Sequence, residues 1–411
     1  MNHRRTRQPH GGRRLRAAVL ATLMGGGVLS LGGAASAAPG ALYVSTAAKA
    51  TGAGTSCLTA KYSSINAAIA AAAPSETVVV CNGTYAGQVT VTKPIVLSGE
   101  NATIIAPKAD NGVLVPVSGA TVQGFIVKGA IGEGILVVGK PGAPVSHVTI
   151  KDNVVEGNDQ GNPTGAALKT SSYAECKGTF SPPAPPTPGD CGEGVHLMVA
   201  QDSTVSGNTV FDNTGGILLT DEFGPNDHNT IEDNTVDYNV LDCGITVASH
   251  SGKGYVHGGT VPAAGGVYDN TIEHNTVIGN GVSGQGAGVL LATGVPGGAV
   301  YDNVVKDNTM SGNGLAGLTL HSHLPGEDLN GNIIEGNTIG TNNVDGDYDF
   351  SPHVDPVPTA VILATVGPVH VTVASNRLSD DTYGIWMAGP VTVSGVSSNT
   401  FVHVSAHTAG S

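Results

Sequence analysis

The stretch Asn229–Asn239 reads NTIEDNTVDYN and places Asn234 and Asn239 five residues apart, beside the aliphatic residues Ile231 and Val236. Seven segments share this register, with an aliphatic residue three before a central Asn and another apolar residue two after it. Their central asparagines are Asn153, Asn208, Asn234, Asn275, Asn308, Asn337 and Asn376. A second polar residue follows each of them five positions later: Asn158, Asn213, Asn239, Asn280, Asn313, Asn342 and Asp381. Such self-similarity is typical of a solenoid.

A second recurring piece, a Gly or Ala followed by a short apolar strand, alternates with these segments. The pieces begin at Gly134, Gly194, Gly216, Gly244, Gly288, Gly317, Ala360 and Gly384. All the segments are short, rich in β-branched residues and separated by Gly and Asn, which favours strands over helices. The sequence therefore predicts an all-β fold, a single-stranded right-handed parallel β-helix. A flat antiparallel sandwich is the alternative.

The stacked turns of a β-helix give the asparagines a structural role. Asn tolerates the left-handed backbone of a sharp corner, so we expect the repeated asparagines at the corners. Each amide would donate a hydrogen bond to one neighbouring turn and accept one from the other, at ~0.5–1.5 kcal/mol net per bond. The flanking aliphatic residues would point inward.

A solenoid has open ends that need caps. The stretch YSSINAAIAAAAP (Tyr62–Pro74) predicts a capping helix, with Ser63 or Ser64 as N-cap and with Ile65 and Ile69 facing the first turn. We expect an N-terminal strand and capping helix over residues 38–75, the β-helix over 76–405 with insertions near 159–191, 250–268 and 343–359, and a C-terminal tail over 406–411.

Residues 1–37 have the features of an export signal. An arginine-rich head is followed by an apolar run from Ala17 to about Gly33 and by Ala35-Ser36-Ala37, an A-x-A cleavage pattern. The run is short and interrupted by Gly, which favours export over a membrane anchor. We therefore expect a signal peptide and a secreted, extracellular protein.

The charge balance excludes two classes of partner. Without the first 37 residues, 12 Lys and Arg remain against 32 Asp and Glu, so the formal net charge is 12 − 32 = −20. Such a surface repels nucleic acid and anionic membranes, and we expect neither as a partner.

The chain has five cysteines. In an exported protein, Cys57 with Cys81 and Cys176 with Cys191 are the natural disulfide pairs. Cys243 is then left over, either as a small buried residue or as a reactive thiol.

The INAAIAAA cap, the VVVCNGTY first strand and the GNTV-type turns with a terminal Asn resemble the pectin-lyase-like superfamily. They are similar to secreted bacterial right-handed parallel β-helix repeat proteins, including NosD-like carbohydrate-binding and sugar-hydrolase repeats. The resemblance covers residues 41–404 and implies that a substrate lies along the outside of one parallel sheet. The pectate-lyase signature of the family also implies an arginine base on that sheet. Here the chain departs from it, because its one arginine after the signal, Arg377, follows Asn376 on a different sheet.

The Gly-initiated strands are the candidate for that sheet, since the three insertions flank them. Residues alternate across a strand, so positions two and four after the Gly face away from the core. With the strand ends, they bring together the candidate catalytic residues His196, Asp221, Glu222, His250, His321 and His323. Histidine beside a carboxylate can act as general acid or base near neutral pH. The candidate substrate-binding residues are Asp242, Thr246, Thr319 and Trp386, although Trp386 is equally suited to cover the last turn.

Two metal sites are open hypotheses. Asp345, Asp347 and Asp349 alternate as in calcium loops, but Phe350 and Pro356 depart from the EF-hand pattern, and a solvated acidic loop is the alternative. His321 and His323, with His250 and Glu222, offer ligands for zinc or copper.

Three functions follow from these patterns. The first is a secreted polysaccharide lyase or glycoside hydrolase that acts as a monomer, on a polysaccharide or oligosaccharide, in a groove over the Gly-initiated strands. The second is a non-catalytic extracellular glycan-binding or surface protein. The third is a NosD-like metal-handling protein. No cofactor is certain, and calcium is the one we consider.

Overall fold

In the computed structural model, the described residues are 40–49, 51–107, 109–158, 192–250, 265–282, 286–342 and 357–410. All of them belong to the unit Ala37–Ser411. The predicted signal peptide, Cys176, Cys191 and the acidic loop with Asp345, Asp347 and Asp349 lie outside the described residues, so those predictions stay untested. No helix of the described part is both long and apolar enough to cross a membrane.

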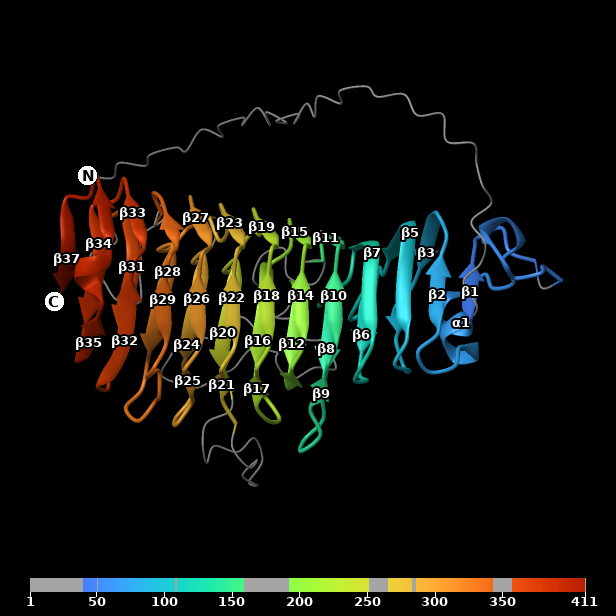
Figure 1. Cartoon of the computed structure of the whole chain (residues 1–411), viewed down its shortest axis with the longest axis horizontal. Helices are drawn as coiled ribbons and strands as arrows, with labels where there is room; N and C mark the ends of the chain where they lie inside the picture. The colour runs from blue at the N-terminus through green and yellow to red at the C-terminus, as the bar shows by residue number, and fades with distance from the viewer. Residues whose placement is uncertain are drawn as a thin grey trace, which may run out of the picture. The chain divides into compact units, whose positions relative to one another are not determined.

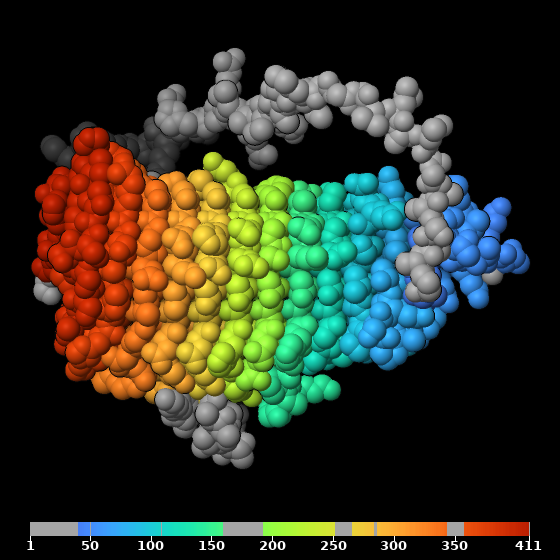
Figure 2. All heavy atoms as spheres, viewed as in Figure 1, coloured from blue at the N-terminus to red at the C-terminus, as the bar shows by residue number. Residues whose placement is uncertain are grey.

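The chain folds as the predicted right-handed parallel β-helix, and successive turns stack in chain order (Figures 1 and 2). Within the described residues, the eight Gly- or Ala-initiated strands belong to an eleven-stranded sheet. Its strands are β4 (Val89–Thr90), β6 (Val113–Val115), β8 (Ile135–Val138), β12 (Glu193–Met198), β16 (Gly215–Thr220), β20 (Ile245–Ser249), β24 (Val289–Thr293), β28 (Leu318–Ser322), β31 (Thr359–Ala364), β34 (Tyr383–Ala388) and β37 (Ala406–Gly410). The strand β37 pairs with β34, so residues expected to form a tail belong to the last turn instead.

The Asn-containing segments form a second parallel sheet, of twenty-one strands in the described part. Its strands are β1 (Ala41–Val44), β2 (Thr77–Val80), β3 (Gly83–Ala86), β5 (Val96–Ile105), β7 (Thr121–Lys128), β10 (Thr149–Lys151), β11 (Val154–Glu156), β14 (Thr204–Ser206), β15 (Thr209–Phe211), β18 (Thr230–Glu232), β19 (Thr235–Asp237), β22 (Thr271–Glu273), β23 (Thr276–Ile278), β26 (Val304–Lys306), β27 (Thr309–Ser311), β29 (Ile333–Glu335), β30 (Thr338–Ile339), β32 (Val369–Ala374), β33 (Arg377–Ser379), β35 (Val391–Ser394) and β36 (Thr400–Val402).

A five-stranded parallel sheet lies between the other two along the chain and consists, in the described residues, of dipeptide strands. They are β9 (Val145–Ser146), β13 (Ala200–Gln201), β17 (Asn226–Asp227), β21 (Val267–Tyr268) and β25 (Val300–Tyr301). The aliphatic residues that flank the asparagines point inward as predicted. Ile231 and Val236, for example, are both fully buried.

The asparagines form ladders along the axis. Asn234 Nδ2 donates to Asn275 Oδ1 at 3.0 Å and to the Val205 carbonyl at 2.9 Å, and its Oδ1 accepts from Asn208. The prediction that Asn itself takes the left-handed backbone is wrong. The residue before it does so, such as Asp233 (φ 55°) or His274 (φ 56°). The Asn side chain then points inward. Its amide forms hydrogen bonds with backbone groups at the corner, where the strand pairing is interrupted.

The structure contains a third ladder that the sequence analysis missed. It runs through Ser203, Asn229, Asn270, Asn303 and Asn332, with amide bonds of 3.0–3.1 Å between successive asparagines. Asn229 lies in the opening stretch, five residues before Asn234, so the signal was present. The turns from Ser203 to Asn332 therefore have three hydrogen-bonded corners, which fix the register of all three sheets there.

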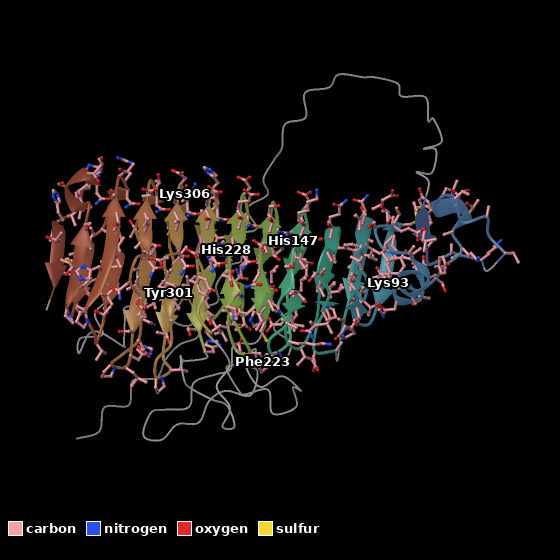
Figure 3. The ribbon with its side chains drawn as sticks, turned by 60° about the horizontal axis from the view of Figure 1, so that its bottom comes forward. Lys93, His147, Phe223, His228, Tyr301 and Lys306 are labelled. Carbon is pink, nitrogen blue, oxygen red and sulfur yellow. A yellow bond between two sulfur atoms is a disulfide. The ribbon has the colours of Figure 1, made fainter. Side chains whose placement is uncertain are left out.

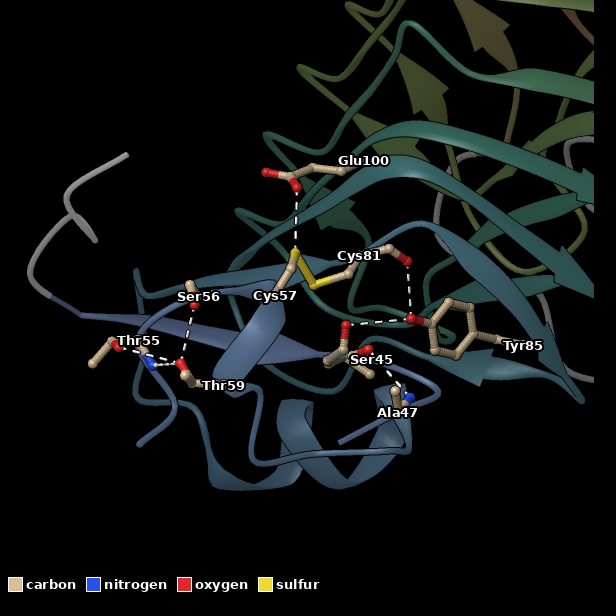
Figure 4. Close-up of a disulfide and its surroundings, with 10 residues drawn as sticks. Ser45, Ala47, Thr55, Ser56, Cys57, Thr59, Cys81, Tyr85 and Glu100 are labelled. Atoms are coloured by element: carbon tan, nitrogen blue, oxygen red, sulfur yellow. Dashed lines mark hydrogen bonds between the residues drawn. A yellow bond between two sulfur atoms is a disulfide. The ribbon is translucent and has the colours of Figure 1, made fainter. Parts of the chain in front are cut away.

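The N-terminal end is closed by the helix α1 (Ile65–Ala71), whose Ser64 N-cap Oγ accepts from Ala67 N at 3.4 Å. Ile65 and Ile69 are buried, as predicted. A short 3-10 helix (Cys57–Thr59) precedes α1, and another (Val396–Ser398) lies near the C-terminal end. The predicted Cys57–Cys81 disulfide is formed and joins the cap to the first turn (Figure 4). Cys243 is a buried free thiol.

Candidate functional site

The register of the eleven-stranded sheet stacks the residues that the sequence placed on its outer face. One row runs His196, Leu218, Thr246, Leu290, Thr319, Ile362 and Trp386, and the next runs Met198, Thr220, Ala248, Ala292, His321, Ala364 and Ala388. The candidate catalytic residues therefore do extend over the five turns from β12 to β28, as predicted.

Much of this outer face is nevertheless inaccessible to solvent, which the strand alternation did not indicate. His196 and Thr319 are fully buried, and Thr246 and His321 are 8% and 7% exposed. Apolar side chains also gather on this face. Leu136, Met198 and Val199 form one cluster, and Trp386 packs against another that contains Ile362. The accessible part of the site is therefore the carboxyl end of the strands, where Glu222 and His250 are partly exposed and His323 is exposed.

A continuous hydrogen-bonded chain connects four turns of the β-helix. His196 Nδ1 lies 3.4 Å from Glu133 Oε1, and His196 Nε2 lies 2.7 Å from Thr220 Oγ1. Thr220 Oγ1 donates to Glu222 Oε2, and Glu222 Oε1 lies 2.7 Å from His250 Nδ1. The sequence analysis missed Glu133. Its signal is a Glu directly before the strand glycine, which occurs at Glu133 and again at Glu193.

The electrostatics of this chain keep Glu222 ionised. Burial raises the pKa of Glu222, but the hydrogen bond and charge of His250, the charge of His196 and the Thr220 hydroxyl outweigh burial and lower that pKa to about 2. The carboxylate holds the imidazole of His250 with Nδ1 toward it, which makes Nε2 the atom that would exchange a proton with a substrate. The arrangement is an oriented His–carboxylate pair at the open end of the sheet.

Asp221 has a different role from its neighbour Glu222. It is fully buried and accepts hydrogen bonds from Ser249 Oγ at 2.9 Å, His250 N at 2.7 Å and Gly266 N at 2.6 Å. These donors occupy both carboxylate oxygens and anchor the backbone of His250. Asp221 and Glu222 therefore do not face each other as an acid–base pair, and Asp221 positions the turn.

The histidines of β28 form a second group. The rings of His321 and His323 lie 4.6 Å apart at an angle of 39°. Burial and the neighbouring His323 lower the pKa of His321 to about 3, so His321 is neutral at neutral pH. Glu327 Oε2 accepts from the backbone N–H groups of His323 and Leu324 at 2.7 and 2.9 Å and fixes the end of the strand.

The two groups are separated by the turn of β24, whose outward residues are small at the carboxyl end of the strand. Ala292 lies beside His321 in the register, and Gly294 follows the end of the strand. A Cβ on Gly294 would lie 3.0 Å from His323 Nδ1, so a larger residue there would crowd the imidazole. His250 and His323 are thus two turns apart, about 10 Å between backbones, with no side chain at Gly294 between them.

The remaining predicted residues do not join either group. Asp242 Oδ1 accepts from the backbone N–H of Cys243 at 2.6 Å, at the opposite end of β20 from His250. Among the described residues, no three His, Cys, Asp or Glu side chains are placed to hold a metal ion. His321 and His323 therefore do not form the zinc or copper site with His250 and Glu222 that was one hypothesis.

The stacked parallel sheets define a right-handed parallel β-helix protein, with its candidate site on the outer face of one sheet. Residues 78–295, more than half of the chain, match the family described as "Right handed beta helix region", and the chain belongs to that family.

Comparison with solved structures agrees with this fold. The alginate lyase from Paenibacillus sp. str. FPU-7 is 15% identical with a TM-score of 0.53, over 85% of this chain and 99% of that one. The pectate lyase Pel9A is 16% identical with a TM-score of 0.51, over 87% of this chain and 78% of that one. No curated protein matches the sequence. Identities this low show the fold, and the activity has to be argued from the site.

Proposed function

We propose that this chain is a secreted, carbohydrate-active enzyme that cleaves a polysaccharide at the carboxyl ends of β16, β20, β24 and β28. The observation that carries the proposal is the Glu222–His250 pair, joined at 2.7 Å and partly exposed at the carboxyl end of a largely buried face. A carboxylate-oriented imidazole is a proton-transfer device. The export signal and the Cys57–Cys81 disulfide support a location outside the cell.

Of the two reaction classes, the geometry favours a lyase. Glycoside hydrolysis uses two carboxyl groups about 5–5.5 or 6.5–9.5 Å apart, one of them protonated. Here Asp221 is occupied by three donors, and Glu222, with a pKa of about 2, is no proton donor at neutral pH. Elimination needs one base, His250, to remove the proton beside a uronate carboxyl. The electron pair of that C–H bond forms the new C=C bond, the C–O bond to the next sugar breaks, and the leaving oxygen takes a proton from the His250 imidazolium or from water. An unsaturated uronate end remains.

The test is a panel of uronate-containing and neutral polysaccharides, assayed for both the ultraviolet absorbance of unsaturated ends and new reducing ends. A lyase gives both signals, and a hydrolase gives reducing ends alone. We expect His250→Ala to lower kcat about 10²–10⁴-fold. The matched control is His228→Ala, because His228 Nδ1 also contacts a carboxylate, Asp227, at 2.6 Å but lies by the five-stranded sheet (Figure 3). Full activity in His250→Ala would overturn the assignment.

A non-catalytic glycan-binding protein is the second candidate. The burial of His196, Thr319 and His321 favours it, because these side chains are withdrawn from a bound sugar chain. This second function predicts that the protein binds a polysaccharide of the panel without cleaving it. The His250→Ala variant should then bind that polysaccharide as the wild type does.

A further inference from the structure

The corner after β19 presents an aromatic ring in an unusual backbone conformation. Tyr238 has φ 53° and is 64% exposed. At the other left-handed corners of the described chain the residues are Gly, Asp, Asn, Ser or His, with one further exception, Val199. A bulky residue in this region is strained, and such strain persists where the surroundings compensate for it or where it serves a function.

Burial compensates for the strain at Val199 but not at Tyr238. Val199 is fully buried in a cluster with Leu136 and Met198. The Tyr238 ring instead lies over Gly279 of the next turn, where a Cβ would be 2.7 Å from Tyr238 Cε1 and 2.8 Å from Cδ1. Gly279 itself has φ 68°. The Cδ1 and Cε1 side of the ring thus lies against Gly279, and most of the side chain reaches solvent.

We propose that Tyr238 is a sugar-binding platform separate from the Glu222–His250 site. A ring that contacts glycine backbone on one side and is otherwise exposed can pack against the apolar C–H face of a pyranose, at little cost in side-chain entropy. The neighbouring carboxylates Asp212 and Asp237 can accept hydrogen bonds from sugar hydroxyls and repel uronates. The ligand class is therefore a neutral pyranose unit, in a neutral polysaccharide or in a neutral branch of an acidic one. A single exposed ring is too small a patch for a stable protein interface.

The choice of ligand class rests on the proposed function, but the site can be tested without turnover. Native gels that contain a neutral β-glucan, xylan, alginate or polygalacturonate measure binding as retardation, in a Glu222→Gln background that prevents digestion. We expect Tyr238→Asn to bind about 3- to 10-fold more weakly and Tyr238→Phe to bind as the parent does. Leu58→Asn is the control, because Leu58 is 98% exposed on the cap.

A second readout separates binding from structure. Asn is favoured at φ near 55°, so Tyr238→Asn should raise Tm while binding falls. Equal retardation of Tyr238→Asn and the parent, a lower Tm in that variant, or no retardation by any glycan would each overturn the platform. Retardation that depends on Tyr238, with no cleavage in the panel, would support the platform and count against the enzyme. Cleavage of a polysaccharide, with retardation that does not depend on Tyr238, would support the enzyme and overturn the platform.

Discussion

Asp381 ends the second Asn ladder and is the one carboxylate in a row of amides, so Asp381→Asn is a sharp test of the ladder. Asn342 N donates to Asp381 Oδ1 at 3.3 Å, whereas Asp381 Oδ2 is buried and has no hydrogen-bond partner in the described structure. In the same ladder, the matching atom of Asn280 is the amide Nδ2, which donates to the Val236 carbonyl at 2.9 Å. An asparagine at position 381 would supply the missing donor.

The magnitude follows from the pKa of Asp381. Burial and the nearby Asp380 raise it from 3.8 to about 7, against the lowering effect of the Asn342 N–H. A shift of that size corresponds to about 4 kcal/mol, as an upper value. Between the two pKa values the folded state holds more protons than the unfolded state. The contribution of Asp381 to the free energy of unfolding is therefore largest below pH 3.8 and is lost as the pH rises through about 7.

We expect Asp381→Asn to unfold at higher urea than the wild type at pH 8, by ~1–4 kcal/mol, and to differ much less at pH 4. Because the end turns of a solenoid can open separately, amide hydrogen exchange of residues 376–410 should be followed alongside the urea transition. Asp307→Asn is the control, since it removes the same charge from an exposed carboxylate at a left-handed corner of another turn. A gain that is equal at both pH values, or equal in the control, would refute the role of the buried carboxylate.

Three further outcomes test other parts of the structure. Asn275→Ala leaves buried donors of the ladder unsatisfied and should lower the free energy of unfolding by at least ~1–3 kcal/mol, as measured by urea melts. Thr276 faces outward, so the control Thr276→Ala should change the free energy of unfolding by less than ~0.5 kcal/mol. Removing the disulfide with Cys57→Ser and Cys81→Ser should lower the free energy of unfolding by ~2–4 kcal/mol. Amide hydrogen exchange should show reduced protection in the N-terminal cap. Above pH 4.5, Glu222→Gln should be less stable than wild type by up to about 3 kcal/mol. Thermal melts should show this difference disappear as the pH falls to about 2.

The regular part of the fold was predictable because one physical requirement recurs in every turn. Inward aliphatic residues and corner asparagines must stack at one spacing, so a register repeated along the sequence is a direct record of the stacking. The error at the corners has a simple origin. Both Asn234 and Asp233 are residue types found in left-handed backbone, and the sequence does not say which of the two takes it.

The candidate site was predictable only in part. Strand alternation gave the direction of His196 and His321, but it carries no information on what covers them. Glu133 was missed because it precedes its strand glycine, whereas the candidate positions were those after the glycine. It reaches His196 from 63 residues away in sequence, across the insertion at 159–191. The length of an insertion does not change which turns are neighbours, so contacts across it appear only once the register of the strands is known.

The candidate site lies where the outward residues of the eleven-stranded sheet change from large to small. In most turns the outward positions of the eleven-stranded sheet carry apolar or hydroxyl side chains that cover one another, as Leu218 and Thr220 do. The β24 turn offers Ala292 and Gly294, between two turns that end in His250 and His323. The ladders on the other corners hold the backbone regardless of what this face carries. Small residues can therefore replace large ones at β24 without loss of register, and the imidazole of His323 lies over Gly294, where a larger side chain would crowd it.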